Sequence, residues 1–182
     1  EQLSTRADGI LRLNEDATRE VKLQALKSLS IEQPAGKPAR KPFHWALEFP
    51  EVFDRENPGF DALVGNPPFQ GGQKITGEYG TDYRNYLVEC IADGRRGSAD
   101  LCAYFFLRGQ KLIRARAGFG FLATNTIAQG GTREVGLGAM VESGITLTRA
   151  VQSRKWPGVA NLEVSHVWGR SGEWHDGFIL GD

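Results

Sequence analysis

The sequence predicts an α/β fold in which helices flank a mixed β-sheet. The first indication is an apolar run at residues 62–64, which is too short for a helix and is followed by Gly65 and two prolines, as at the end of a strand. Helical periodicity follows over residues 82–92 and 101–116. Further strand patterns lie at residues 118–125, 145–151 and 162–168. Strands that alternate with helices in this way are typical of an α/β domain.

Composition sets broad limits on the class of protein. A chain of 182 residues with 40% hydrophobic and 24% charged residues is long enough for one domain with a substantial core. The formal net charge of +0 gives no overall indication of nucleic-acid binding, although a local basic patch would still attract phosphate. The sequence shows no signal peptide and no apolar run that could span a bilayer, so we expect no membrane and a reduced, cytoplasmic setting.

Neither the cysteines nor the histidines are spaced like metal ligands. Cys90 and Cys102 are too few for a disulfide framework, and their spacing is not that of a metal site. His44, His166 and His175 are scattered along the chain. We therefore predict no zinc cluster and no other metal site.

Residues 1–42 are predicted to form an N-terminal helix and a linker. Between Val21 and Leu29, apolar residues recur at helical spacing with charged residues opposite. Residues 31–42 contain three prolines and one glycine, a composition typical of a linker. The aromatic-rich residues 43–53 follow, and we expect them to form a strand that turns at Pro50 and packs against residues 62–64.

The stretch that ends the first strand is predicted to be a stiff polar corner. The apolar run suits a strand covered on both faces, and Gly65 permits a turn or a close approach to a ligand. Pro67 and Pro68 have fixed φ and lack N–H donors, so the strand cannot continue through them. Pro67 also keeps Asn66 extended. An amide and the ring of Phe69 are therefore presented at the carboxyl end of a strand, where open α/β sheets bind ligands.

Asn66-Pro67-Pro68-Phe69 resembles motif IV of the amino-methyltransferases, which use S-adenosylmethionine. The resemblance implies that the Asn66 side-chain oxygen and the Pro67 carbonyl accept hydrogen bonds from the amine of a target base. Because that amine's lone pair is delocalised into the ring, holding its two N–H bonds favours the pyramidal nitrogen that attacks a methyl group. Phe69 would stack on a base that has been flipped out of the duplex. Pro68 completes the motif, and Asn66 would also border the cofactor.

Two flanking phrases sharpen the resemblance. Residues 43–53 (Phe-His-Trp-Ala-Leu-Glu-Phe-Pro-Glu-Val-Phe) and residues 71–77 (Gly-Gly-Gln-Lys-Ile-Thr-Gly) are similar to phrases that surround motif IV in large bacterial DNA methyltransferases of restriction–modification systems, the Eco57I-like kind. The resemblance covers residues 43 to about 170. It implies a Rossmann-like fold, S-adenosylmethionine as cofactor, double-stranded DNA as partner, and methylation of adenine N6 in restriction–modification or phage defence.

Residues 70–83 are predicted to form a glycine-rich loop. Gly72 and Gly77 have the spacing of a P-loop, but the Lys-Ser/Thr pair that must follow is missing. From the resemblance we expect the loop to close over the target base or to touch DNA, with Lys74 and Arg84 as phosphate contacts. The alternative is a mobile surface loop.

The later elements are predicted to complete the sheet. Ser98 or Asp100 would cap the helix at 101–116, whose second half gathers cations that suit a helix C-terminus. The strand at 118–125 would bring Asn125 to the same edge as Asn66, and Arg133 in the following segment is expected to contact DNA. The strands at 145–151 and 162–168 resemble the antiparallel pair that finishes a methyltransferase sheet.

Parts of a methyltransferase are missing from the sequence. No glycine-rich loop at the end of an early strand cradles the methionine part of the cofactor, and no acidic strand end holds its ribose. We therefore expect residues 43–182 to be the C-terminal, catalytic-motif part of a methyltransferase domain, with the remainder of a larger polypeptide as its partner. The isolated chain is then expected to be inactive. Two alternatives stay open: methylation of guanine N2 in RNA or of glutamine in protein, and a fragment that binds DNA without catalysis.

Overall fold

The computed structural model describes residues 43–157, 159 and 162–181, together with residues 16, 19, 20, 23, 24, 26, 27, 35 and 36. Of the predicted N-terminal helix, each described residue between 16 and 27 is helical, and residues 35–36 form a turn. The rest of the prediction for residues 1–42 lies outside the described residues. No described helix combines the length and the apolar character needed to cross a membrane.

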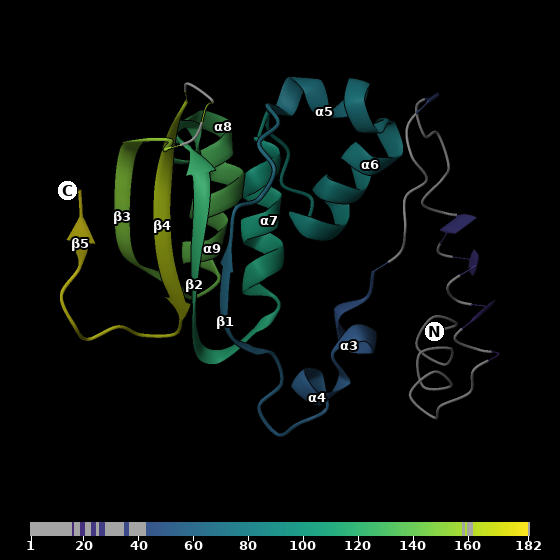
Figure 1. The fold of residues 1–182 in the computed structure, drawn as a ribbon, viewed down its shortest axis with the longest axis horizontal. Helices are drawn as coiled ribbons and strands as arrows, with labels where there is room; N and C mark the ends of the chain where they lie inside the picture. The colour runs from purple at the N-terminus through teal and green to yellow at the C-terminus, as the bar shows by residue number, and fades with distance from the viewer. Residues whose placement is uncertain are drawn as a thin grey trace.

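The described strands form a single mixed sheet in the order β1-β2-β4-β3-β5 (Figure 1). Their bounds are β1 Phe60–Gly65, β2 Ile113–Thr124, β3 Ile145–Lys155, β4 Glu163–Ser171 and β5 Ile179–Leu180. β1 and β2 are parallel, and β4 runs antiparallel to both of its neighbours, β2 and β3. The carboxyl ends of β1, β2 and β3 therefore lie at one edge of the sheet, and β4 begins there. This arrangement confirms the predicted α/β fold and the predicted antiparallel pair.

The core lies between one face of this sheet and the helices behind it in Figure 1, which include α7 (Leu101–Gln110) and α9 (Ala139–Glu142). Phe106 of α7 packs against Phe119 and Phe121 of β2, with ring centroids 6.0 and 5.1 Å apart. At Gly109 a Cβ would lie 2.8 Å from the Phe121 ring, so this glycine permits the close approach of α7 to the sheet. Met140 of α9 is completely buried in the same core.

Among the described residues nothing covers the opposite face of β1, which corrects the prediction of a strand covered on both faces. Because successive strand residues point to opposite faces, Ala62 and Val64 lie away from the face that holds Phe119. Both are exposed, Val64 to 89%. The apolar run correctly predicted the strand. An apolar run alone, however, does not show which face of the strand other segments cover.

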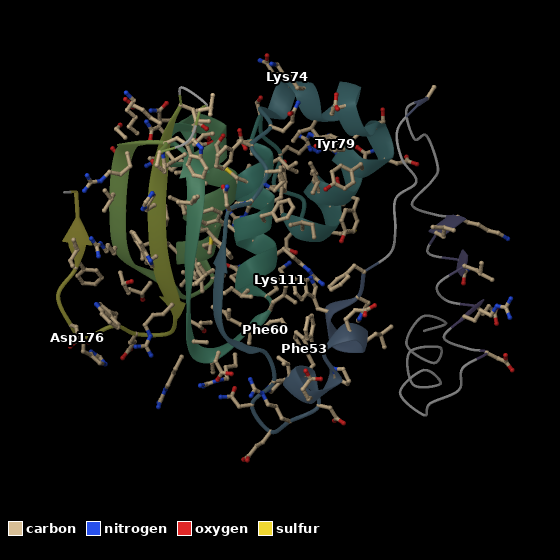
Figure 2. All side chains as sticks on the ribbon, viewed as in Figure 1. Phe53, Phe60, Lys74, Tyr79, Lys111 and Asp176 are labelled. Atoms are coloured by element: carbon tan, nitrogen blue, oxygen red, sulfur yellow. The ribbon has the colours of Figure 1, made fainter. Side chains whose placement is uncertain are left out.

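Residues 43–53 form two short helices, α3 (Trp45–Glu48) and α4 (Pro50–Phe53), so the prediction of a strand here was wrong. Pro50 is the first residue of α4, a position where its missing N–H costs nothing. These helices pack on the first residue of β1, Phe60, and not on residues 62–64 as predicted. The rings of Trp45, Phe49 and Phe53 lie 5.4–5.6 Å from that of Phe60 (Figure 2).

The predicted loop at residues 70–83 is largely helical. It contains α5 (Gly72–Tyr79) and the start of α6 (Thr81–Tyr86), which continues as a π-helical turn at Leu87–Ile91. Ile75 is completely buried, and this packing outweighs the cost of about 1 kcal/mol for a helical glycine. Gly80, with φ of 90°, separates α5 from α6. The glycines that favoured a loop therefore mark the ends and the exposed side of a helix.

The helix predicted at residues 101–116 ends earlier, at Gln110, and β2 begins at Ile113. A tight turn closes α7, in which the Leu112 N–H bonds to the Gly109 carbonyl at 3.0 Å. Arg114 and Arg116 therefore belong to β2. The helix-dipole explanation for the cations therefore holds for Arg108 in the last turn of α7 and for Lys111 at its C-cap, but not for the two arginines of β2.

The chain between β2 and β3 is a run of short helical segments. It comprises η2 (Asn125–Ala128), α8 (Gly130–Arg133), η3 (Glu134–Gly138) and α9, and Gly144 with φ of 89° ends it, as predicted. β5 pairs with β3 through only two residues and was not predicted.

Candidate active site

The Asn66-Pro67-Pro68-Phe69 motif follows β1 directly at the carboxyl edge of the sheet. The Asn66 side chain is exposed, and Pro67 is buried beneath it. Pro68 is exposed, and Phe69 is half-buried with part of its ring against the hydrophobic core. The corner thus offers an amide to solvent while two of its residues hold it to the protein.

The chain after Phe69 is fixed to the N-terminus of α7. The Gln70 N–H donates to Asp100 Oδ1 at 3.2 Å, and the Leu101 N–H donates to the Gln70 carbonyl at 2.8 Å. Asp100 Oδ1 also accepts from the Cys102 N–H at 3.0 Å, so the same carboxylate caps the helix. Asp100 is 7% exposed, and its N–H donates to Thr132 Oγ1 at 3.1 Å.

The cap at Asp100 was predicted, but its bond to Gln70 was not. The two residues are far apart in the sequence, and no local pattern reports such a contact. Gly72 brings the start of α5 to the same place, because a Cβ there would lie 2.6 Å from the Ala99 carbonyl oxygen. The motif is therefore followed by a tightly packed junction of α5 and α7.

Asn125 lies just after β2 at the same edge, as predicted, and its amide ties the ends of three strands together. Its Oδ1 accepts from Ser165 Oγ at 2.7 Å and from the Ser153 N–H at 3.2 Å. Its Nδ2 donates to Ser153 Oγ at 3.1 Å and to Glu163 Oε2 at 3.3 Å. Ser153 has φ of 55°, in the left-handed region, so the amide holds a bulged part of β3.

The three predicted cationic contacts lie on separate helices. Lys74 is exposed in the first turn of α5 (Figure 2). Arg84 on α6 is half-buried, and its Nη2 donates to the Gly97 carbonyl at 2.9 Å. Arg133 is exposed at the end of α8, beside Arg95, which forms an ion pair of 2.5 Å with Glu142.

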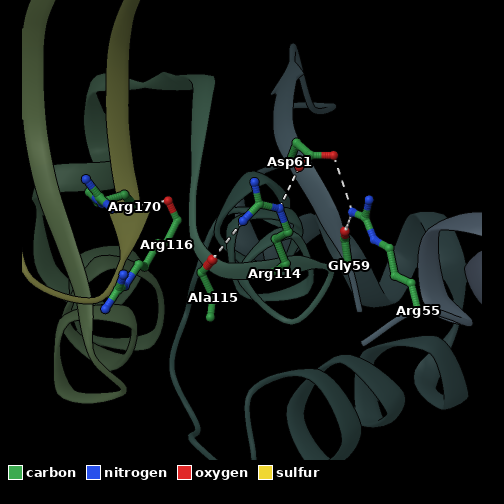
Figure 3. Close-up of polar contacts among 7 residues, drawn as sticks. All are labelled: Arg55, Gly59, Asp61, Arg114, Ala115, Arg116 and Arg170. Carbon is green, nitrogen blue, oxygen red and sulfur yellow. Dashed lines mark hydrogen bonds and ion pairs between the residues drawn. The ribbon is translucent and has the colours of Figure 1, made fainter. Parts of the chain in front are cut away.

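A carboxylate between two arginines lies at the other end of β1 (Figure 3). Arg114 Nε donates to Asp61 Oδ1 at 2.5 Å, and Arg55 Nη2 donates to Asp61 Oδ2 at 3.3 Å. These hydrogen bonds, that from Arg114 first, lower the pKa of Asp61 below its ordinary value. The cluster joins the start of β1 to β2 and to the preceding loop. Asp61 lies five residues before Asn66 along an extended strand, so the cluster is not part of the corner.

Two buried groups of α7 are held in their neutral forms. Burial, followed by the charge of Asp100, raises the pKa of the Cys102 thiol far above its ordinary value. Burial also raises the pKa of the Tyr104 hydroxyl. Cys102 is therefore a packing residue and not a nucleophile. In the described part of the chain, no three His, Cys, Asp or Glu side chains come together as potential metal ligands.

Solved structures similar to this chain include two methylation-related enzymes. One is the type IIL restriction-modification enzyme MmeI in complex with DNA, at 20% identity and a TM-score of 0.55. The aligned region covers 66% of this chain and 17% of MmeI. The other is a putative class I S-adenosylmethionine-dependent methyltransferase from Listeria monocytogenes, at 8% identity and a TM-score of 0.50. The aligned region covers 68% of this chain and 36% of the Listeria protein. The chain thus spans well under half the length of either, and the likeness shows a Rossmann-like α/β fold.

A comparison with curated proteins finds no match. Residues 5–136, more than half of the chain, match the family of Eco57I restriction-modification methylases. This match agrees with the motif and with both flanking phrases. The chain therefore belongs to the Eco57I restriction-modification methylase family.

Proposed function

We propose that this chain is the catalytic-motif part of a DNA methyltransferase that transfers a methyl group from S-adenosylmethionine to N6 of adenine in double-stranded DNA. The observation that supports the proposal best is the exposed amide of Asn66, placed by two prolines at the carboxyl end of β1. Membership of the Eco57I family supports methylation within a restriction-modification system. Such an enzyme would act in the cytoplasm, where it meets the cell's DNA.

The proposed chemistry needs acceptors and no strong base. Asn66 Oδ1 and the Pro67 carbonyl would each accept one N–H of the adenine amine, which favours a pyramidal nitrogen with a localised lone pair. S-adenosylmethionine supplies the electrophilic methyl group when it is bound. The nitrogen would form the new N–C bond as the S–CH3 bond breaks and S-adenosylhomocysteine leaves, and the proton that the nitrogen then loses would pass to solvent. Acceptors that are already in place stabilise this geometry without reorganisation.

The packing around the corner explains how it would remain in place. Pro67 is buried, and the Gln70 backbone is bonded to both Asp100 and Leu101. Phe69 has one part of its ring in the core and is half-exposed. We propose that the exposed part of the ring stacks on the flipped adenine. The contact of the ring with the core would fix the position at which the base stacks.

Roles in DNA binding are proposed for four residues: Lys74, Arg84 and Arg133 as contacts, and Asn125 as a support of the sheet edge. Lys74 and Arg133 are exposed, as phosphate-binding cations must be. Arg84 uses Nη2 for the Gly97 carbonyl, which leaves other N–H donors of its guanidinium for a phosphate. Asn125 makes four hydrogen bonds within the chain, so its contribution to DNA binding would be to keep the edge of the sheet in shape.

The described residues fit only one side of a cofactor site. At the carboxyl edge, the end of β1 offers the exposed Asn66 amide, whereas the amide after β2 is engaged within the chain. We therefore propose that residues 43–182 are one part of the methyltransferase domain and that the rest of the cofactor site belongs to a larger polypeptide. Residues 1–42 are proposed to be a helical segment and linker that precede this part.

The test is to express the full-length protein in a host that lacks adenine methylation and to map N6-methyladenine across its DNA. We expect methylation in one sequence context. This methylation should be absent with Asn66→Ala and retained with the exposed control Asn57→Ala. A soluble protein that binds S-adenosylmethionine but leaves no methyladenine would rule out adenine in DNA as its substrate. Restriction or phage protection that survives Asn66→Ala would instead support a non-catalytic DNA-binding role.

A further inference from the structure

The segment that leads into α7 packs directly against the start of α5 and against α8. A Cβ at Gly72 of α5 would lie 2.6 Å from the Ala99 carbonyl oxygen, and a Cβ at Gly131 of α8 would lie 3.2 Å from the Ser98 nitrogen. The two glycines thus bring backbone against backbone, with no side chain of their own in between. Because closely packed backbone cannot adapt by a change of rotamer, a shift of one segment is transmitted to the next.

Hydrogen bonds join the same parts of the chain. Thr132 Oγ1 of α8 accepts from the Asp100 N–H at 3.1 Å, and Asp100 Oδ1 accepts from the Gln70 N–H at 3.2 Å. Thr132 and Asp100 are 5% and 7% exposed, so water does not readily replace the bond between them. Gln70 follows Asn66 by four residues, and the two prolines between them have fixed φ. The bonds therefore form a continuous path from α8 to the Asn66 corner.

Neighbouring residues supply the buried side and the exposed side of α8. Thr132 is buried, whereas the next residue, Arg133, is exposed and is the phosphate contact proposed above. α8 has only four residues and runs straight into the π-helical η3. A helix this short is not held in place by its own hydrogen bonds, so its buried contacts fix its position. A phosphate bound by Arg133 would therefore act on a segment whose buried side is bonded to Asp100.

We propose that Thr132 is a positioning residue that couples a DNA contact at Arg133 to the corner at Asn66. The coupling runs through Asp100 and Gln70, so Thr132 itself touches neither the DNA nor the target base. Its hydroxyl holds Asp100, and Asp100 holds the chain that leaves the corner. The acceptors of the corner are thereby aligned when a phosphate engages α8. The inference rests on the proposed function, which supplies the roles of Arg133 and Asn66.

The first test compares two substitutions of Thr132 in the full-length protein by amide hydrogen exchange. Thr132→Val keeps the shape of the side chain but removes the hydroxyl, whereas Thr132→Ser keeps the hydroxyl. In peptides that contain residues 69–72, we expect exchange to be about tenfold faster with Thr132→Val and unchanged with Thr132→Ser, because one lost hydrogen bond shifts the local opening equilibrium by about this factor.

Met140→Val is the control for a general loss of stability. It shrinks a completely buried side chain of α9, which lies outside this path of hydrogen bonds. Exchange at residues 69–72 should not change in this variant. Unchanged exchange with Thr132→Val would overturn the proposal, and so would exchange that is equally fast with Thr132→Ser or Met140→Val.

The second test is a double-mutant cycle on single-turnover methylation at saturating DNA. Thr132→Val should slow methyl transfer about tenfold, while the dissociation constant of the duplex changes less than about twofold. Arg133→Ala should weaken DNA binding and also slow methyl transfer at saturation. If DNA binding acts through Thr132, the double variant is no slower than Thr132→Val alone. Rates that fall multiplicatively, or an Arg133→Ala enzyme with the natural rate at saturation, would overturn the coupling.

Hydrogen exchange needs no methylation, so the coupling and the proposed function can fail separately. In a protein that does not methylate adenine, saturating duplex DNA should still slow exchange at residues 69–72, and it should not do so with Arg133→Ala. That result would contradict the proposed function alone. Slowing that is equal with and without the Arg133 side chain would overturn the coupling, whether or not the protein methylates adenine.

Discussion

Asp100 Oδ1 accepts hydrogen bonds from the Gln70 N–H at 3.2 Å and from the Cys102 N–H at 3.0 Å. One buried carboxylate oxygen thus both caps α7 and holds the chain that leaves the Asn66 corner. The Asp100 N–H reaches Thr132 on α8, so three segments meet at this residue. The rigidity that the proposed chemistry requires is supplied, on the carboxyl side of the motif, by the end of a core helix.

Asp100→Ala is expected to lower the free energy of unfolding by about 2–3 kcal/mol. The substitution removes a helix cap, worth about 1 kcal/mol, and leaves the Gln70 N–H without its acceptor in a partly buried place. Urea denaturation of the full-length protein measures the change. Asp176→Ala, at an exposed site far from α7 in Figure 2, is the control and is expected to have no effect. Equal stability of the two variants would contradict the role given to Asp100.

Asn66→Ala is expected to reduce methyl transfer by about 10²–10³-fold, the usual cost of removing one preorganised hydrogen bond from a transition state. Because the Asn66 side chain is exposed, the unfolding midpoint should not change. Asn66→Asp keeps an oxygen acceptor and is expected to retain more activity than Asn66→Ala. The measurement is single-turnover methylation of a duplex. An Asn66→Asp enzyme as inactive as the alanine variant would argue against the acceptor role.

The corner at Asn66 could be predicted from sequence because the residues that build it act locally. Pro67 fixes its own φ and restrains Asn66, and the strand before it is an unbroken apolar run. The helix at Gly72–Tyr79 could not be predicted in the same way. Its glycines favour a loop, and only the burial of Ile75 against distant residues reverses that preference.

Contacts between distant residues, and the covering of a face, were also beyond the sequence pattern. The bond between Gln70 and Asp100 joins residues 30 positions apart. The apolar run at 62–64 predicts the strand correctly, yet the exposure of Val64 depends on which segments pack above it. Arg114 was placed in a helix because residues 101–116 are periodic, whereas pairing with β1 draws it into β2.

Asn125→Ala is expected to lower the free energy of unfolding by about 2–3 kcal/mol, because buried Ser165 loses its hydrogen-bond acceptor and the ends of β2, β3 and β4 lose their link. The full-length protein should therefore unfold at lower urea concentration than the Asn57→Ala control. DNA affinity is measured in parallel at several salt concentrations. A stable Asn125→Ala protein with weaker DNA binding would show a direct contact instead of a structural one.

Cys90 and Cys102 are expected to differ sharply in reactivity. Cys90 is exposed, whereas Cys102 is completely buried and its thiol pKa is raised by burial. A thiol-reactive reagent at pH 8 should modify Cys90 in the folded protein and Cys102 only after denaturation. Peptide mass spectrometry with and without guanidinium distinguishes the two sites. Fast modification of Cys102 in the folded protein would mean that the N-terminus of α7 opens readily.

Asp61 is expected to make stability depend on pH in the acid range. Hydrogen bonds from Arg114 and Arg55 lower its pKa in the folded state below the ordinary value of 3.8. A carboxylate with a depressed pKa stabilises the fold above its unfolded pKa, and this contribution is lost as the pH falls through the folded value. The difference in free energy of unfolding between the natural protein and Asp61→Asn should therefore be present at pH 7 and shrink below about pH 4. Because the side chain is exposed, this difference should also be smaller in 1 M salt. Urea denaturation at each pH measures it. A difference that persists unchanged at pH 2 would show that packing around Asp61, and not its charge, joins the start of β1 to β2.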